Sequence, residues 1–362
     1  MPTATPEQKA AITGVFNRLV RGTSSSIAGL AGTGKTFVIS ELYKLCVTSN
    51  HFDLVLVLAP TGKATIVLGK KGIPARTVHS VAYNFKGYDE FEKPIFAKKR
   101  NGRFACAVIV DEWSMVPKSM ENNLVERGFP MCCVGDPGQL PPVQSEPSDL
   151  LENPTYELKT IHRQRADNPI IDFAYCIREG AKSITDYHPG INQIEARSLS
   201  NYQIAERALR EGVDTLICWK NRHRNRLNNA FREVLGKRGT LDVGEKILCL
   251  NNNRELAIYN GQAFDVLSVE EEDDAIVYAT IVDSDGIGKP MTVAMEKNQF
   301  GRETTQPKQE DSAELFDYAY AITCHKAQGS QWNHVGVIGP QPMTSWQYTA
   351  VTRAENSLTV FY

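Results

Sequence analysis

Several features are scarce or missing in this sequence of 362 residues. No apolar run approaches the ~20 residues that span a bilayer, and the first ten residues lack the charged and apolar segments of a signal peptide. No two cysteines have the C-x-x-C spacing that is typical of zinc ribbons. The formal net charge is only −2, so no overall positive field favours nucleic acid. We therefore expect a soluble, cytoplasmic protein without a membrane segment or a zinc site.

What is present indicates a globular protein with parallel sheets. The chain is 42% hydrophobic and 23% charged, and its length allows two domains with separate cores. Its eight cysteines lie mostly in apolar runs such as "ACAVIV", so we expect reduced core residues. Apolar strand-like runs alternate with helical segments, which favours parallel sheets covered on both faces. Strands are predicted over 24–30, 54–60, 105–112, 131–136, 215–219, 335–339 and 358–362, and helices over 6–21, 36–48, 117–127, 168–179, 201–211, 222–235 and 343–354.

These strands are too many for one sheet, so we predict two α/β domains. Their boundary is expected in the proline-rich stretch "QLPPVQSEPSD", which gives a first domain over 1–150 and a second over 151–362. The aromatic and basic residues 84–104 interrupt the first domain as a pin-like insert, with "KKRNGR" as a hairpin turn. Short alternating runs over about 245–305 predict a small antiparallel, SH3-like β module in the second domain.

A phosphate-binding loop is predicted at residues 29–36, which read "GLAGTGKT". In such a loop the backbone N–H groups surround the phosphates at the start of a helix. The lysine would reach the β- and γ-phosphates, and the threonine hydroxyl would ligate Mg²⁺. A glycine turn before a helix is the simpler alternative. The residues expected to bind the nucleotide here are Gly32, Thr33, Gly34, Lys35 and Thr36.

Polar residues follow two further predicted strands. The strand in "VIVDEWSM" ends in Asp111 and Glu112, where one carboxylate would hold Mg²⁺ and the other would polarise the attacking water. Gln139, in "CVGDPGQLPPV", could contact the γ-phosphate or that water. An exposed acidic pair and an ordinary turn are the respective alternatives.

Two arginines and two basic runs are further candidates for functional residues. Arg163 in "TIHRQR" and Arg353 in "YTAVTRAEN" could each neutralise charge on a transferring phosphoryl group, although either also suits a surface ion pair. The basic runs at 97–103 and 220–226 are either solvated faces or local sites for nucleic acid, with Asn221 in the second run a candidate DNA contact.

Taken in order, the segments "TPEQKAAI", "GLAGTGKT", "APTGKA", "TVHS", "VIVDEWSM", "GDPGQLPPV", "IHRQ", "AYAITCHKAQGSQW" and "YTAVTRA" resemble successive motifs of superfamily 1 helicases. The chain is most similar to the RecD-like branch, including the Dda-type phage helicases, over residues 6–362. The resemblance implies two RecA-like domains with ATP bound between them, single-stranded DNA across their tops, and movement from 5′ to 3′.

The resemblance also implies roles for single residues. Gln8 matches the glutamine that reads adenine, while Gln328 and Gly329 match residues that couple DNA to ATP. The expected DNA contacts are Pro60, Thr61, His79, Thr323, His325 and Lys326. Either histidine, taken alone, could instead be an ordinary buried residue. In the insert we expect Phe96 to stack on the last base pair and separate the strands, although it could equally pack the insert onto the domain.

We therefore expect an ATP hydrolase, a Mg²⁺-dependent DNA helicase or translocase, active as a monomer in replication, repair or recombination. Its expected partners are single-stranded DNA, duplex junctions, and replication or recombination proteins. The alternatives are an NTP-dependent switch, or the nucleotide-binding subunit of a larger nuclease complex whose nuclease is a separate polypeptide. ATPase turnover with and without single-stranded DNA separates the motor from the switch.

Overall fold

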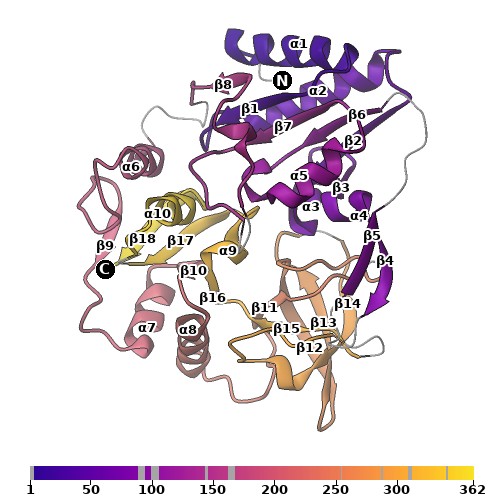
Figure 1. Ribbon diagram of the computed structural model, residues 1–362. Coiled ribbons are helices and arrows are strands. Elements are labelled where there is room, and N and C mark those ends of the chain that lie inside the picture. The colour runs from indigo at the N-terminus through magenta and orange to yellow at the C-terminus, as the bar shows by residue number, and fades with distance from the viewer. Residues whose placement is uncertain are drawn as a thin grey trace. The chain divides into compact units, whose positions relative to one another are not determined.

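The computed structural model describes residues 4–88, 94–98, 106–142, 146–161, 168–253, 255–286, 288–308, 312–339 and 341–362. The described residues divide into two compact units, one up to Ile171 and one from Asp172 to Tyr362 (Figure 1). The first unit continues past residue 150, where the prolines suggested a boundary, because a strand at Tyr156–Leu158 pairs with the strand before the glycine-rich loop. No helix of the described residues is long and apolar enough to cross a membrane.

The first unit contains a parallel sheet with the strand order β3-β2-β6-β7-β1-β8. Its strands are β1 (Ser25–Gly29), β2 (Leu54–Ala59), β3 (Ala75–Thr77), β6 (Cys106–Val110), β7 (Met131–Gly135) and β8 (Tyr156–Leu158). The central strands β1, β6 and β7 are buried along their whole length. This explains their nearly continuous apolar sequences, which are typical of parallel strands covered on both faces.

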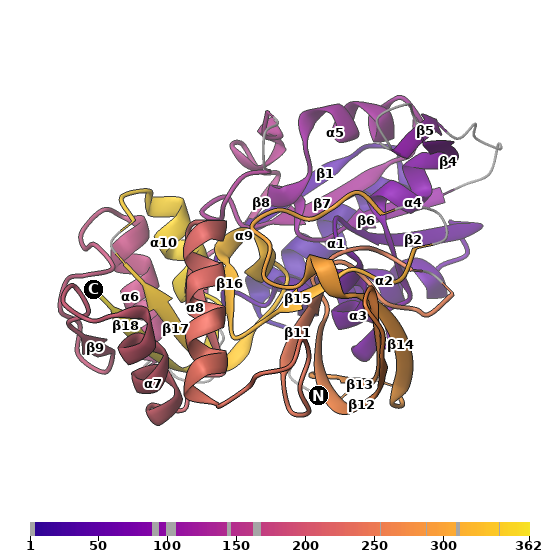
Figure 2. The ribbon, with the colours of Figure 1, turned by 90° about the horizontal axis from the view of Figure 1, so that it is seen from below.

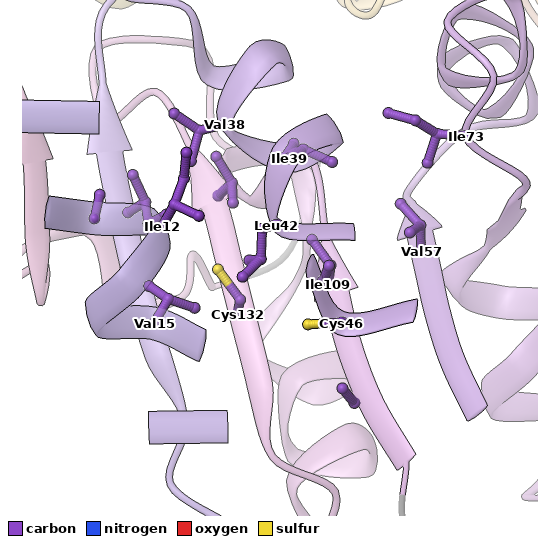
Figure 3. Close-up of a cluster of buried hydrophobic side chains, with 14 of the residues drawn as sticks. Ile12, Val15, Val38, Ile39, Leu42, Cys46, Val57, Ile73, Ile109 and Cys132 are labelled. Atoms are coloured by element: carbon purple, nitrogen blue, oxygen red, sulfur yellow. The ribbon is translucent and has the colours of Figure 1, made fainter. Parts of the chain in front are cut away.

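Helices cover both faces of this sheet, and alternate strand residues point to each face. One core combines α1 (Pro6–Val20), α2 (Lys35–Thr48) and α3 (Gly62–Lys70) with strand residues such as Val57, Ile109 and Cys132 (Figure 3). The other core contains α4 (Val78–Ala82), α5 (Lys118–Val125) and the intervening strand residues Val108 and Cys133. α1 begins with a capping box, in which the Thr5 hydroxyl accepts from the Gln8 N–H and the Gln8 side chain accepts from the Thr5 N–H.

The second unit contains a parallel sheet with the order β16-β10-β17-β18-β9. In Figures 1 and 2, α7 and α8 lie on one face of it and α10 lies on the other. Residues of α7 and α8 share a core with Leu216, Ala321 and Phe361 of the sheet. The elements are α6 (Pro169–Arg178), β9 (Asn192–Ile194), α7 (Asn201–Arg210), β10 (Thr215–Cys218), α8 (Asn221–Val234), β16 (Ala321–Thr323), α9 (Cys324–Ala327), β17 (Trp332–Ile338), α10 (Thr344–Val351) and β18 (Ala354–Phe361).

A five-stranded antiparallel sheet, ordered β14-β13-β12-β11-β15, forms the predicted β module of the second unit. Its strands are β11 (Lys246–Cys249), β12 (Ala263–Glu272), β13 (Ile276–Asp283), β14 (Met291–Glu296) and β15 (Phe316–Tyr318). Glu314, just before β15, exchanges backbone hydrogen bonds with β14, so the sheet closes on itself. The module therefore ends near residue 318 rather than 305, since β15 supplies the strand beside β11.

The insert of the first unit contains the antiparallel pair β4 (Tyr83–Tyr88) and β5 (Pro94–Lys98). Phe85 is the register partner of Phe96, and Tyr88 that of Pro94. The predicted turn in "KKRNGR" lies, apart from Lys98, outside the described residues. Three short 3₁₀ segments, at Trp113–Met115, Asp149–Leu151 and Lys297–Gln299, complete the described elements.

The structure confirms the two parallel sheets, the antiparallel module and most of the predicted elements. α10 ends at Val351 rather than at 354, because Ala354 already starts β18. Seven of the eight cysteines are buried and the eighth, Cys176, is half-buried, and all eight are free thiols.

Candidate nucleotide and nucleic-acid sites

The carboxyl ends of the parallel strands meet at one edge of each sheet, and we call these the first and the second carboxyl edge. In open α/β sheets, ligands bind at this edge. Five of the strands that end at the first carboxyl edge, taken in the sheet order β3, β2, β6, β7 and β1, are each followed by a segment with predicted site residues. α4 with His79 follows β3, Pro60 and Thr61 follow β2, Asp111 follows β6, Gln139 follows β7, and the glycine-rich loop follows β1.

The glycine-rich loop has the backbone that a phosphate-binding loop requires. Gly34 caps α2 with φ 81° and ψ 28°, a left-handed conformation that other residues rarely adopt. Gly29 has no room for a side chain, because a Cβ atom there would lie 2.6 Å from the Thr33 hydroxyl oxygen. That hydroxyl donates to the Leu30 carbonyl oxygen at 2.9 Å, and Thr33 is fully buried. The loop is therefore braced internally at the start of a 14-residue helix.

Lys35 lies within this loop rather than in solvent. Its Nζ atom donates to the carbonyl oxygens of Gly29 and Leu30, both at 2.9 Å, and lies 3.7 Å from an Asp136 carboxylate oxygen. Asp136 is fully buried directly after β7. The ammonium group is thus held at the mouth of the loop between the ends of two neighbouring strands.

Asp111 and Glu112 are buried to different extents. Asp111 is only 9% exposed, and burial, followed by the negative charge of Glu112, raises the pKa of its carboxyl group to about 7. A hydrogen bond from the Glu112 N–H and the charges of Lys35 and Lys71 act in the opposite direction on this pKa. Burial and the neighbouring negative charge disfavour the ionised carboxylate, so this position suits a bound cation.

Glu112 adopts a strained backbone conformation, with φ 49° and ψ 43°. A non-glycine residue in this region costs on the order of 1–3 kcal/mol and is concentrated at functional sites. Its Oε2 atom is buried without a hydrogen-bond partner among the described residues. The alternative of an exposed acidic pair is therefore not observed, because Asp111 is buried and Glu112 is half-buried.

Gln139 provides a second buried acceptor at the same edge. The residue is 6% exposed, and its Oε1 atom has no hydrogen-bond partner in the described part of the chain. Buried polar atoms are nearly always partnered in folded proteins. Two such atoms, from Glu112 and Gln139, fit a site that receives water and a hydrated divalent cation. Thr36, the second residue of α2, and Asp111 are the residues that fit Mg²⁺ ligation.

Gln8 fastens α1 to the phosphate-binding loop. Its Nε2 atom donates to the Thr33 carbonyl oxygen at 3.2 Å, and its Oε1 atom accepts from the Thr5 N–H. The residue is 4% exposed. Adenine recognition by Gln8 stays a prediction, and the observed contact gives Gln8 a structural role beside the glycine-rich loop.

The predicted DNA contacts of the first unit lie at the opposite end of the first carboxyl edge from the glycine-rich loop. The Thr61 hydroxyl accepts from the Ala64 N–H at 3.2 Å and caps α3. Ala59 of β2 is the register partner of Thr77, which precedes the helix carrying His79. Pro60, Thr61 and His79 are all half-buried. They therefore share one stretch of the edge and remain candidate DNA contacts.

Arg353 is not the surface ion pair that its sequence context also allowed. It is 4% exposed, and its guanidinium donates to the Thr349 and Ser330 carbonyl oxygens and to the Thr352 hydroxyl. No carboxylate of the described residues lies within 4.0 Å of it. A buried charge without a counter-ion is costly. The guanidinium is therefore suited to an anionic ligand.

The segment from Thr323 to Ser330 connects the remaining predicted residues. Thr323 ends β16, and His325 and Lys326 follow it in α9. Burial lowers the pKa of both His325 and Lys326, and Lys326 donates to Asn260 Oδ1 at 2.6 Å. At its other end, the segment passes buried Gln328 and Gly329, which has φ 74°, and presents the Ser330 carbonyl to Arg353. One short segment thus joins the predicted DNA contacts to the buried arginine.

Two predicted residues cannot be placed in this way. Arg163 lies outside the described residues. Phe96 belongs to β5, where the structure gives the backbone register only.

Two features were missed from the sequence. Asp136, beside Lys35, lies in the "GDPGQ" turn whose glutamine alone was considered, although its position directly after β7 gave a signal. Trp219, which is 46% exposed at the end of β10, gave no signal because "TLICW" reads as an apolar strand.

Asp172, Cys176 and His188 form a further group of possible metal-ligating atoms, all within 4.8 Å of one another. His188 contacts Asp172 Oδ2 through Nε2 at 2.8 Å and the Pro189 carbonyl through Nδ1 at 2.9 Å. Both partners are oxygen acceptors, so the two contacts are hydrogen bonds at the same time only when both ring nitrogens carry a proton.

Comparisons with known proteins agree with this arrangement. Residues 3–197 match the family model described as an AAA domain, and residues 318–361 match the UvrD-like helicase C-terminal domain. The chain is 30% identical to the ATP-dependent RecD2 DNA helicase of Deinococcus radiodurans, over 91% of this chain and 46% of that protein. It is 27% identical to the conjugal transfer protein TraA of Agrobacterium fabrum, over 98% of this chain and 32% of that protein.

Two solved structures share the fold. The crystal structure of the Pif1 helicase from Candida albicans aligns with a TM-score of 0.63 at 19% identity, over 100% of this chain and 94% of that one. Bacteroides Pif1 bound to single-stranded DNA aligns with a TM-score of 0.61 at 18% identity, over 99% and 92% of the two chains. The chain spans less than half the length of the curated relatives named above.

Proposed function

Because the chain belongs to the AAA domain family and is a RecD-like member of helicase superfamily 1, we propose that it hydrolyses ATP to move along single-stranded DNA and to unwind duplexes. The direction we propose is 5′ to 3′. The observation that carries the proposal is the first carboxyl edge. There an internally hydrogen-bonded glycine-rich loop adjoins two buried acceptors, Glu112 Oε2 and Gln139 Oε1, that have no hydrogen-bond partner within the described residues.

The chemistry follows from the groups at that edge. Lys35 would exchange its contacts with the Gly29 and Leu30 carbonyls for the β- and γ-phosphates of ATP, which are stronger acceptors because they are charged. Glu112 would accept a hydrogen bond from the attacking water, and Gln139 would orient the same water. Their unsatisfied oxygens are buried, so these bonds form in a medium where they are stronger than in bulk water.

Thr36 and Asp111 would hold the Mg²⁺ ion. When bound, Mg²⁺ neutralises negative charge on the phosphates. The burial that disfavours an isolated Asp111 carboxylate is offset when a cation is beside it. Asp111 thereby contributes to binding of the metal–nucleotide complex rather than of the nucleotide alone.

Arg353 would stabilise charge on the transferring phosphoryl group. Its guanidinium is held by three hydrogen bonds in one orientation, which lowers the cost of ordering it during hydrolysis. The link through Ser330 to Lys326 and His325 gives a physical route by which DNA binding and hydrolysis could affect each other. We assign the coupling role of Gln328 and Gly329 to this segment.

DNA binding would combine phosphate contacts with contacts to unpaired bases, so we expect it to depend on salt and little on sequence. The experiment is an unwinding assay with Mg²⁺ and ATP on duplexes that carry either a 5′ or a 3′ single-stranded tail. The proposal expects unwinding of the 5′-tailed duplex only. Unwinding of the 3′-tailed duplex alone would overturn the direction. Absence of unwinding from both, with intact ATPase, would favour a nucleotide-dependent switch or a subunit of a larger complex.

A further inference from the structure

Trp219 is placed unusually for a tryptophan. It follows β10 and is 46% exposed, whereas Trp113 and Trp346 are 0% and 1% exposed. Tryptophan has the largest apolar surface of the side chains, so an exposed ring forgoes much of the stabilisation that burial would give. The Lys220 ammonium lies 5.0 Å from the centre of its ring. The ring therefore stands at the surface with a cation beside it.

The residues after Trp219 are basic and exposed. Lys220, Arg222 and Arg226 are all exposed, and the sequence contains no acidic residue from 215 to 232. Positive charge at the start of a helix opposes the helix dipole, so these residues do not serve the stability of α8. By contrast, Arg224 points inward and pairs with buried Asp317 at 2.8 Å. The three exposed cations are thus available to an anion.

Trp219 also lies beside predicted DNA contacts. β10 and β16 are parallel neighbours, and Cys218 is the register partner of Thr323. Trp219 and Lys220 follow β10, and His325 and Lys326 follow β16, so both pairs lie after the same stretch of the second carboxyl edge.

We propose that the Trp219 ring stacks on an unpaired base of bound single-stranded DNA, with Lys220 and Arg222 contacting the adjacent phosphates. A single strand fits because stacking on an exposed ring requires a base that is not already paired, and the exposed cations match its charge. The inference rests on the proposed function and adds to it a base-stacking residue outside the residues predicted from the motifs.

The test compares Trp219→Ala with Trp219→Phe in binding of an oligothymidine strand, measured by fluorescence anisotropy of the labelled DNA. Losing one stacked base should weaken binding by about 5- to 150-fold in the alanine variant. Trp219→Phe, which keeps an aromatic ring, should stay within ~3-fold of the wild type. Because the ring is at the surface, both variants should unfold at wild-type urea concentrations.

An abasic strand of equal length separates stacking from charge. On that strand the wild type and Trp219→Ala should bind equally, because the base that would stack is absent. Arg222→Gln is the matched charge variant: it should weaken binding to both strands and reduce the salt slope by about 0.7. Trp219→Ala should leave that slope unchanged.

The wild type offers a readout that needs no substitution. Trp113 and Trp346 are buried and Trp332 is half-buried, so Trp219 is the most exposed tryptophan. Oligothymidine should quench the intrinsic tryptophan fluorescence, and Trp219→Phe should lose that quenching while still binding. If the wild type binds the strand but Trp219→Ala binds it equally well, the stacking inference is wrong. If the wild type binds no single strand, the proposed function is wrong, and this inference with it.

Discussion

The two carboxyl edges are built from the same kind of parallel sheet but present opposite surfaces. At the first edge the polar side chains are buried, since Asp111, Asp136 and Gln139 are each less than a tenth exposed. At the second edge Trp219, Lys220 and Arg222 are exposed. Buried groups act strongly on a small ligand that displaces water, whereas exposed cations and rings suit a long polymer that must slide past. The comparison teaches that one architecture can present buried polar groups at one edge and exposed cations with an aromatic ring at another, which we propose serve hydrolysis and DNA binding respectively.

This contrast predicts the largest effects at the first edge. Glu112→Gln should reduce ATP turnover by at least about a hundredfold, because the group that accepts a hydrogen bond from the attacking water is lost. The isosteric amide should still bind ATP, measured with a fluorescent analogue. Lys35→Ala should lose both turnover and tight ATP binding. If Glu112→Gln hydrolysed ATP at near wild-type rates, Glu112 would not be the acceptor for the attacking water. The contrast between the two edges would then lose its catalytic side.

Arg353 should show the next largest effect, since it is a buried charge in the second unit. Arg353→Ala should lower the DNA-stimulated kcat at least about tenfold, because a charge contact in the transition state is lost. Its Kd for single-stranded DNA without nucleotide should change little. Arg353→Lys, which keeps the charge but not the three hydrogen bonds, is the matched variant. Weak DNA binding with intact turnover would instead make Arg353 a phosphate-backbone contact.

The insert of the first unit should affect unwinding and not hydrolysis. Phe96→Ala should keep the ATPase stimulated by single-stranded DNA within about twofold, while duplex unwinding falls severalfold for loss of one stacking contact. Phe85→Ala, which changes the register partner on β4, is the control. A parallel fall in both activities, or no change in either, would show that Phe96 does not separate the strands.

The smallest expected effect is a pH dependence of stability at the second edge. Burial lowers the pKa of His325 below its ordinary value of 6.5, so the folded state holds the neutral ring. As the pH falls through 6.5, the unfolded chain binds a proton that the folded chain resists, and stability decreases. His325→Gln should flatten the change of the urea midpoint between pH 7 and about pH 5. An unchanged pH profile would show that His325 is not shielded from water.

Much of the first edge could be predicted because its signals are local in sequence. The loop at 29–36 and the residues after β6 and β7 lie at fixed distances from long apolar strands, and the structure places them on neighbouring strands. The strands β3, β8, β9 and β16 were missed, since each has three residues and is specified by its partner strand rather than by its own pattern. α3 was missed because Thr65, Ile66 and Val67 weaken its helix propensity, while the Thr61 cap fixes its start.

The exposure of single side chains could not be predicted from the hydropathy pattern of the sequence. Hydropathy would predict an exposed Arg353 and a buried Trp219. The structure shows the reverse, with Arg353 buried and Trp219 at the surface. Both departures occur at positions where a ligand is proposed, as expected when function overrides local preference.

The most direct measurement of the central claim is the ATPase rate with and without single-stranded DNA, in Mg²⁺ and saturating ATP. If the first edge hydrolyses and the second edge grips the strand, DNA should raise kcat at least about tenfold in the wild type, and Glu112→Gln should show no such rise. Equal rates with and without DNA, at concentrations where the strand is bound, would contradict the account.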